Sequence, residues 1–257
     1  MIDLTISLTY YGQVEKLITH CDFFSSLDET IRNKITVQMI NDGFNDQNIF
    51  TDTLKLYKDN FNLKGYVIKQ DIGFNNHGCR NLAMLKSQTH WNWLIDIDAN
   101  PEPDLIEAIL TTPLQDEQFY VFEVYFDHID NPEDYDLYDP KNILKWVAHP
   151  NIWLITKPCF WSSGGYDMEF AGMRHGDQEF FESINKDKYE HFLFHPELEK
   201  KHKLFINSPN RTKSYLNQIT EHVGYLNKCV DFVNKRNDNK DRKFKKRLIC
   251  FDWERVV

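Results

Sequence analysis

The sequence predicts an α/β domain built on a mixed, mainly parallel β-sheet that is flanked by helices. Short apolar runs rich in β-branched residues alternate with stretches whose apolar residues recur at helical spacing. The chain has 257 residues, 41% of them hydrophobic and 14% aromatic, which is enough for one large globular core. Alternating strands and helices are typical of βαβ units, in which neighbouring strands run parallel.

In the first half of the chain, strands and helices are expected to alternate. The strands are apolar runs: Ile2–Tyr10, Ile35–Ile40, Tyr66–Ile68 and Trp93–Ile97. The helices carry apolar side chains three or four residues apart: Val14 to Phe24, Ile49–Phe61, His77–Lys86 and Asp104–Leu110. Ligands of such sheets bind beyond the carboxyl ends of the strands, so polar clusters at these ends indicate where a site would lie.

The second half adds strands at Tyr120–Phe126 and Ile152–Thr156, and a helix that opens near His175. The α/β domain is therefore expected to span residues 1–205. Residues 206–257 are expected to form a helical, basic extension that packs on this domain, with a helix at Tyr215–Val233. Lys235–Arg247 holds eight basic residues in thirteen. This basic segment is either a solvated helix face or linker, or a contact for a polyanion such as an anionic membrane surface, glycan or nucleic acid.

Composition excludes several classes of protein. The formal net charge of −9 argues against a chain that mainly coats nucleic acid. The five cysteines are scattered and include no CxxC pair, which excludes a disulfide scaffold and a cysteine-built zinc site. No apolar run approaches the ~18 residues of a membrane helix, and the first residues do not look like a signal peptide. A cytoplasmic protein is expected, with peripheral membrane attachment through the basic segment left open.

Two carboxylates, Asp96 and Asp98, are expected at the end of the fourth strand. Alternate side chains of an extended strand project to the same side, so the pair should point the same way. Burying both as unpaired charges is costly, and a divalent cation removes that cost. Oxygen ligands suit Mg²⁺ or Mn²⁺, whose coordination is commonly completed by substrate phosphates. The alternative is a solvated turn that contains two acids.

Three segments occur in an order that resembles a known family. They are the strand followed by Asn41-Asp42-Gly43, then Gly73 to Ala83 leading into Asp96-Ile97-Asp98, and then Gly164-Gly165-Tyr166-Asp167 followed by Asp177-Gln178-Glu179-Phe180. Over residues 2–185 this set is similar to glycosyltransferase family 2, whose members have the GT-A fold, a Rossmann-like mixed sheet. The resemblance implies an enzyme that uses a nucleotide-sugar donor.

The resemblance implies a nucleotide pocket at the ends of the first two strands. Thr9 and Tyr10 would line this pocket, and Asp42 would hydrogen-bond the base. That base is commonly uracil in the family, which makes a UDP sugar the favoured donor. Considered by itself, Asn41-Asp42-Gly43 is also an ordinary turn.

The resemblance also implies a site for the diphosphate and the metal. Arg80 stands where the family has an arginine near the diphosphate, and a planar guanidinium suits that role; the alternative is a surface salt bridge. Asp96 would contact the nucleotide sugar or metal-bound water, and Asp98 would ligate Mn²⁺ or Mg²⁺. A late histidine sometimes completes the metal shell in GT-A enzymes, which makes His191, or His195, a candidate.

Asp177 is implied as the general base that removes the acceptor's proton. The family's usual glutamate before this base is Gly176 here, and a shift of register would make Glu179 the base instead. Candidates for contacts with the acceptor are Trp161, Gly164 and Gly165. Trp161 could equally be packing, and the glycine pair predicts a close backbone approach.

The function expected from the resemblance is inverting, metal-dependent transfer of a sugar to a hydroxyl acceptor. Acceptors of this kind include a glycan, a lipid-linked sugar and a modified nucleic acid. One alternative is a nucleotidyltransferase, although the segment Thr9-Tyr10-Tyr11-Gly12-Gln13 lacks the Gly-rich signature with a lysine that this class usually shows. The other is a non-catalytic module of the same fold that binds a nucleotide or a sugar.

Overall fold

The computed structural model describes residues 3–72, 75–122, 124–126, 152–171, 176–185, 187–192, 204–206, 249 and 251–257. The expected helix Tyr215–Val233, the basic segment Lys235–Arg247 and the candidate ligand His195 lie outside these residues. His191 stands in strand β9 (Glu190–Phe192), where only its place in the strand is described.

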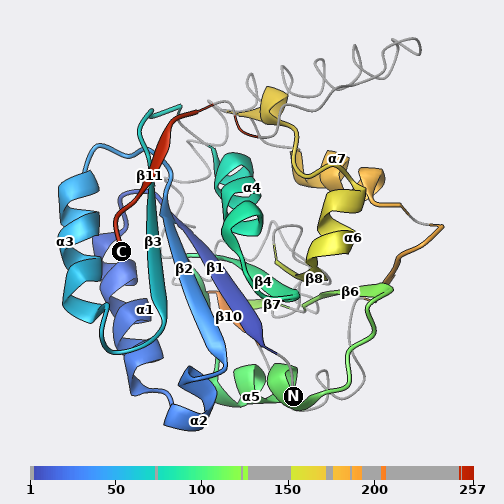
Figure 1. Ribbon diagram of the computed structural model, residues 1–257, viewed down its shortest axis with the longest axis horizontal. Helices are drawn as coiled ribbons and strands as arrows, with labels where there is room; N and C mark the ends of the chain where they lie inside the picture. The colour runs from blue at the N-terminus through green and yellow to red at the C-terminus, as the bar shows by residue number, and fades with distance from the viewer. Residues whose placement is uncertain are drawn as a thin grey trace, which may run out of the picture.

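Four parallel strands form one side of the main sheet, as expected from the alternating pattern. They are β1 (Leu4–Tyr10), β2 (Ile35–Asn41), β3 (Leu63–Ile68) and β4 (Trp91–Asp96), in the spatial order β3-β2-β1-β4. In the register of these strands, Tyr10 is opposite Asn41, and Thr9 is opposite Asp96. The carboxyl ends of β1, β2 and β4 therefore meet at one edge of the sheet (Figure 1).

The other side of the sheet is mixed. Strand β8 (Trp153–Thr156) runs antiparallel to both β4 and β6 (Gln118–Val121), and β9 runs parallel to β6. The expected strand Tyr120–Phe126 is divided, because β7 (Val124–Phe126) leaves the main sheet and joins β5 (Ala99–Asn100) and β10 (Leu204–Ile206). Phe122, between the two parts, is buried with its ring 5.2 Å from that of Trp93.

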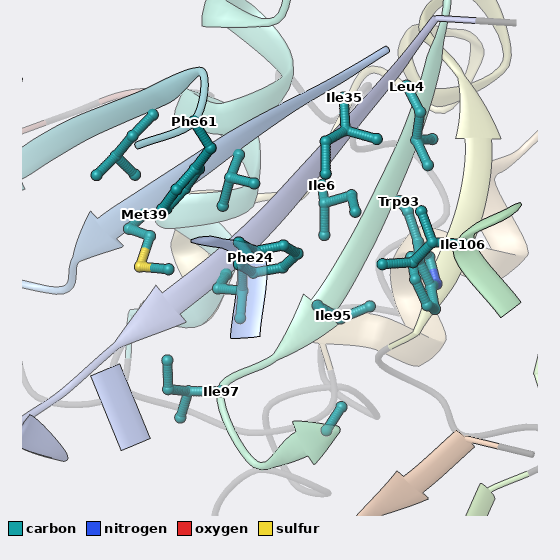
Figure 2. Packing of buried hydrophobic residues seen from close by; sticks show 14 of the residues in the cluster. Leu4, Ile6, Phe24, Ile35, Met39, Phe61, Trp93, Ile95, Ile97 and Ile106 are labelled. Atoms are coloured by element: carbon teal, nitrogen blue, oxygen red, sulfur yellow. The ribbon is translucent and has the colours of Figure 1, made fainter. Parts of the chain in front are cut away.

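Helices cover both faces of the main sheet. The core on one face joins β1, β2 and β4 to α1 (Val14–Ser26), α3 (Gln47–Tyr57) and α5 (Pro103–Thr111). Figure 2 shows part of it, with Phe24 of α1 and Ile106 of α5 among the strand side chains. The opposite face packs against α4 (Asn76–Lys86), α6 (Lys157–Ser162) and α7 (Gly176–Ser183). The short α2 (Glu29–Arg32) and the 3₁₀ turn η2 (Met168–Phe170) complete the described helices.

Helix α3 is shorter than expected. It ends at Tyr57, before the expected end at Phe61. Phe61 lies in the loop that follows, and its side chain is buried. The ring of Phe61 lies 5.8 Å from that of Phe24. An apolar residue beyond the helix end can thus satisfy helical spacing while it packs from a loop.

The last residues of the chain form a strand. Strand β11 (Trp253–Arg255) pairs antiparallel with β3, which would otherwise be an outermost strand with an unpaired side (Figure 1). In the expected helical extension, the part that is described is therefore extended and hydrogen-bonded to the domain. Just before it, Phe251 is buried beside Gly78 of α4. No helix among the described residues has the length and apolar character needed to span a bilayer.

Candidate functional site

The candidate site lies at the carboxyl ends of β1, β2 and β4, beside α4 and α7. Asp42 follows β2 directly, and its backbone N–H donates to the carbonyl of Tyr10. Asp96 ends β4, and Arg80 comes from the middle of α4. Asp177 stands in the first turn of α7, which lies on the same side of the sheet as α4 (Figure 1). The fold therefore brings these four residues, which the sequence singles out, to one edge of the sheet, with Arg80, Asp96 and Asp177 in direct contact.

Arg80 is the centre of this cluster. Its Nη2 donates to Asp96 Oδ1 at 2.7 Å, and its Nη1 donates to the Tyr166 hydroxyl at 3.0 Å and to Asp177 Oδ1 at 3.4 Å. The Arg80 side chain is only 3% exposed. Burial opposes its charge, but Tyr166, Asp96 and Asp177 raise the pKa of Arg80 above its ordinary value. The guanidinium thus bridges the acid at the end of β4 and the candidate base.

Asp177 is held from two sides by cationic or proton-donating groups. Its Oδ1 faces Arg80, and its Oδ2 lies 3.6 Å from Nε2 of His77. Burial alone would raise the pKa of Asp177, but interactions with His77 and Arg80 outweigh it and lower that pKa. An ionised carboxylate at neutral pH is the form a general base needs.

Glu179, the alternative base, has a different environment. It is on the same helix as Asp177, but its Oε1 accepts a hydrogen bond from Ser183 at 2.7 Å, one turn further along α7. Residues two apart on a helix do not face the same side. The cluster around Arg80 thus contains Asp177, while Glu179 accepts a hydrogen bond from Ser183 of its own helix.

Tyr166 connects the glycine-rich turn to this cluster. Its ring stacks on Phe180 of α7 at 4.3 Å and on His77 of α4 at 5.2 Å. Its backbone is fixed by Asn81, whose Nδ2 donates to the Tyr166 carbonyl at 2.7 Å and whose Oδ1 accepts from the Tyr166 N–H at 2.9 Å. Both residues lie in segments that carry the family resemblance, but their contact spans 85 positions and no local pattern predicts it.

The acceptor-side candidates lie in and before the turn that leads to Tyr166. Gly164 and Gly165 have φ values of +79° and +75°, a conformation that side chains rarely adopt. The Gly164 N–H donates to the Trp161 carbonyl, and the Gly165 N–H donates to the hydroxyl of Ser163. Trp161 is half-buried with its ring edge-on to Phe160. The glycine pair therefore has a structural reason, since it lets the chain turn and present Tyr166 to Asn81.

At the nucleotide end, the two adjacent tyrosines have different surroundings. Tyr10 is fully buried, donates its hydroxyl to Asp46 and packs its ring 5.0 Å from that of Phe50. Tyr11 is 38% exposed, and its ring contacts that of Phe44 at 4.7 Å. The aromatic surface at this edge thus belongs to Tyr11. Strand periodicity does not separate the two tyrosines, because β1 is buried on both faces, with Thr5 and Ser7 as well as Ile6 and Leu8 out of solvent.

Asp42 is almost entirely buried beside the start of α4. Its side chain accepts a hydrogen bond from the backbone N–H of Asn75 at 2.9 Å, and the residue is 3% exposed. Burial is the main reason that the pKa of Asp42 rises to about 7, and the charge of Asp71 adds to this increase. Hydrogen bonds from Asn75 and Cys79 act in the opposite direction. Near neutral pH, Asp42 can therefore act as a hydrogen-bond donor as well as an acceptor.

The raised pKa of Asp42 predicts a stability that depends on pH. Because the folded state binds this proton more tightly than the unfolded state, the contribution of Asp42 is greatest below about pH 4 and is lost as pH rises through about 7. Asp42→Asn should remove this loss, since the amide oxygen can still accept from Asn75. We expect urea denaturation to show a smaller fall in unfolding free energy between pH 5 and pH 8 for this variant. The exposed Asp52→Asn is the control, and equal slopes for all three proteins would contradict the prediction.

The two acids of the predicted metal site lie in different environments. Asp96 is 20% exposed and accepts from Arg80 and Asn76. Asp98 is half-buried, and its charge acts on Lys16 of α1. No group of at least three His, Cys, Asp or Glu side chains gathers for a metal among the described residues. The carboxylate oxygens of these two acids are nevertheless of the kind that Mn²⁺ and Mg²⁺ prefer as ligands.

The sequence matches no protein-family model and no curated protein. The fold of this chain does resemble those of several solved structures. TarS of S. aureus, residues 1–349, gives a TM-score of 0.56 at 14% identity, over 81% of this chain and 61% of that one. The same protein in complex with UDP-GlcNAc gives 0.55 at 12% identity, over 81% and 59%.

A mannosyltransferase from Pyrobaculum calidifontis, in complex with GDP-Man and Mn²⁺, gives a TM-score of 0.52 at 15% identity, over 82% of this chain and 60% of that one. This chain spans about three fifths of the length of these structures. At identities this low, the structural similarity shows a shared architecture. The chain therefore has the GT-A glycosyltransferase fold that its sequence predicts, with a mixed sheet whose parallel strands end at the candidate site.

Proposed function

We propose that this protein is an inverting, metal-dependent glycosyltransferase that moves a sugar from a nucleoside diphosphate, with a UDP sugar favoured, to a hydroxyl acceptor. The observation that carries the proposal is the bridge that Arg80 makes between Asp96 and Asp177 at the carboxyl edge of the sheet. The fold adds support, because similar structures hold UDP-GlcNAc or GDP-Man.

Donor recognition would use the other end of the same edge. The half-exposed ring of Tyr11 offers a surface on which a base can stack. Asp42 lies next to it and can hydrogen-bond a base as donor or acceptor. Thr9 is near the end of β1, opposite Asp96 in the strand register. It is half-buried and would complete the wall of the pocket.

The reaction breaks the bond between the sugar and the diphosphate. Asp98, with Asp96 beside it, would hold Mn²⁺ or Mg²⁺, which stabilises the negative charge of the leaving diphosphate when bound. Asp177 would remove the proton of the acceptor hydroxyl as the oxygen attacks the anomeric carbon. Direct attack from the side opposite the leaving group inverts this carbon, so one carboxylate base is sufficient.

The acceptor is proposed only as a class. A glycan, a lipid-linked sugar or a modified nucleic acid each carries a hydroxyl group that Asp177 could deprotonate. Trp161 and the turn at Gly164 and Gly165 would lie on the acceptor side, because this turn leads to Tyr166 beside Asp177. The basic segment Lys235–Arg247 would favour an anionic acceptor or an anionic membrane surface.

Thermal unfolding with nucleotides tests the donor site. We expect UDP with Mn²⁺ to stabilise the protein, by about 2.7 kcal/mol at a hundredfold excess over Kd. The same nucleotide should stabilise it much less in the presence of EDTA or in the Asp98→Ala variant. The exposed Asp52→Ala is the matched control and should keep the full effect. GDP, ADP and CDP are measured in parallel to identify the base.

The outcomes separate the proposed enzyme from its alternatives. Release of UDP from a UDP sugar, in water or with an acceptor, supports a glycosyltransferase. Stabilisation by UDP without any turnover of a UDP sugar would instead favour a non-catalytic module. Formation of pyrophosphate from a nucleoside triphosphate and a sugar 1-phosphate would favour a nucleotidyltransferase. No stabilisation by any nucleotide, with Mn²⁺ or Mg²⁺, would contradict the proposal.

A further inference from the structure

The imidazole of His77 is fully buried against the helix that carries Asp177. It belongs to the first turn of α4, and its Nε2 lies 3.6 Å from Asp177 Oδ2. On one face the ring stacks on Tyr166, with centroids 5.2 Å apart and planes 21° apart. Tyr166 is itself fixed by Asn81 and stacked on Phe180. The position of the His77 ring is therefore determined by its packing.

Gly176, directly before Asp177, is packed against the same ring. A Cβ atom at this position would lie 2.6 Å from Cε1, 2.7 Å from Nε2 and 2.9 Å from Nδ1 of His77. These distances are shorter than van der Waals contact, so a larger residue would force the ring or the helix to move. Since Tyr166 backs the ring, His77 has little room to yield. The glycine that departs from the resembled pattern thus has a steric reason, which is to admit His77.

We propose that His77 is a positioning residue for the base Asp177, and that Gly176 is required so that the imidazole can reach it. Arg80 contacts one oxygen of the Asp177 carboxylate and His77 contacts the other, so the plane of the carboxylate is fixed from both sides. Contacts of this kind are often long before substrate binds and shorten in the reacting complex. The inference rests on the proposed function, in which Asp177 accepts the proton of the acceptor.

The groups that face Asp177 predict the direction of a change in pH profile. They are His77 and Arg80 from α4, together with Tyr166 from the turn before η2. Because His77 helps to lower the pKa of Asp177, its removal should raise that pKa. The acidic limb of kcat/KM should then move to higher pH, while a purely structural role would leave the limb in place.

The first test compares His77→Gln with the wild type in hydrolysis of a UDP sugar. We expect kcat to fall by up to about 100-fold, with KM changed little, because the carboxylate is misplaced while the donor site is intact. The acidic limb should shift upward. His90→Gln is the matched control, because His90 is exposed and paired with Asp116, outside the Arg80 cluster. An active His77→Gln with the kcat and pH profile of the wild type would overturn the inference.

The second test uses a double-mutant cycle and does not require turnover. Gly176→Ala alone should lower Tm, because its methyl group meets the His77 ring. In the His77→Ala background the same change should cost much less, so the two effects should not add. Additive losses of Tm would overturn the steric part of the inference. A wild type that turns over no nucleotide sugar would overturn the proposed function as well, whereas an active wild type with unchanged variants overturns only this inference.

Discussion

Asp177→Asn is expected to reduce turnover of a nucleotide sugar by about 10²–10⁴-fold, the usual contribution of a general base. Asparagine keeps the size and the hydrogen-bonding oxygen of the side chain but cannot accept the proton of the acceptor hydroxyl. Arg80 can still donate to that oxygen, so the cluster should remain assembled. The proposed donor contacts, Asp42 and Tyr11, lie at the other end of this edge, so KM for the donor should change little. Steady-state kinetics on the purified protein measures both constants.

The environment of Asp177 also predicts which carboxylate should matter most. Interactions with His77 and Arg80 keep its pKa low in spite of burial, which makes it ionised at the pH of the assay. Asp116→Asn, a matched change at an exposed acid that pairs with His90, should leave kcat within about twofold, because isolated surface substitutions have small effects. A larger loss in Glu179→Gln than in Asp177→Asn would show that Glu179 is the base. Equal activity of Asp177→Asn and the wild type would contradict the assignment.

The place of the site could be predicted because it depends on features that are local in sequence. Parallel strands end at the same edge of a sheet, and polar residues follow the apolar runs directly at Asp42 and Asp96. Helical spacing likewise placed Arg80 within α4. For these residues, the position in an element determines the position in space, so a motif and its periodicity are enough.

The contacts inside the site could not be predicted, because they depend on how α7 docks. His77 and Asp177 are 100 positions apart, and no periodicity within either helix brings them together. The role of Gly176 is of the same kind, since a missing side chain is informative only once its neighbour is known. The exposure of Tyr11 beside the buried Tyr10 could not be predicted from strand periodicity, because β1 is buried on both faces. The division of the expected strand Tyr120–Phe126 could not be predicted either, since it depends on pairing with strands that come later in the chain.

Arg80→Met is expected to destabilise the fold by about 3–5 kcal/mol at neutral pH, because it leaves two carboxylates without their shared cation. Arg80 is 3% exposed, and Asp96 and Asp177 are 20% and 14% exposed, so water can compensate only in part. Methionine fills much of the volume of the arginine stem, which separates the loss of charge from the loss of packing. Lys55→Met removes a lysine that pairs with Asp52 at the surface and should change stability by less than about 0.5 kcal/mol.

The pH dependence distinguishes lost charge pairing from damaged packing. Arg80 contributes to the lowered pKa of Asp177, so this contribution to stability is present above the unfolded pKa of about 4 and is lost as pH falls through the folded value. Wild type and Arg80→Met should therefore differ most in urea denaturation at pH 7 and less as the carboxylates become protonated. Arg80→Lys should recover only part of the difference, because one ammonium group cannot match the fork of a guanidinium that reaches Asp96, Asp177 and Tyr166 together. A difference that stays constant between pH 7 and pH 3 would mean that Arg80 stabilises this edge through its packing alone.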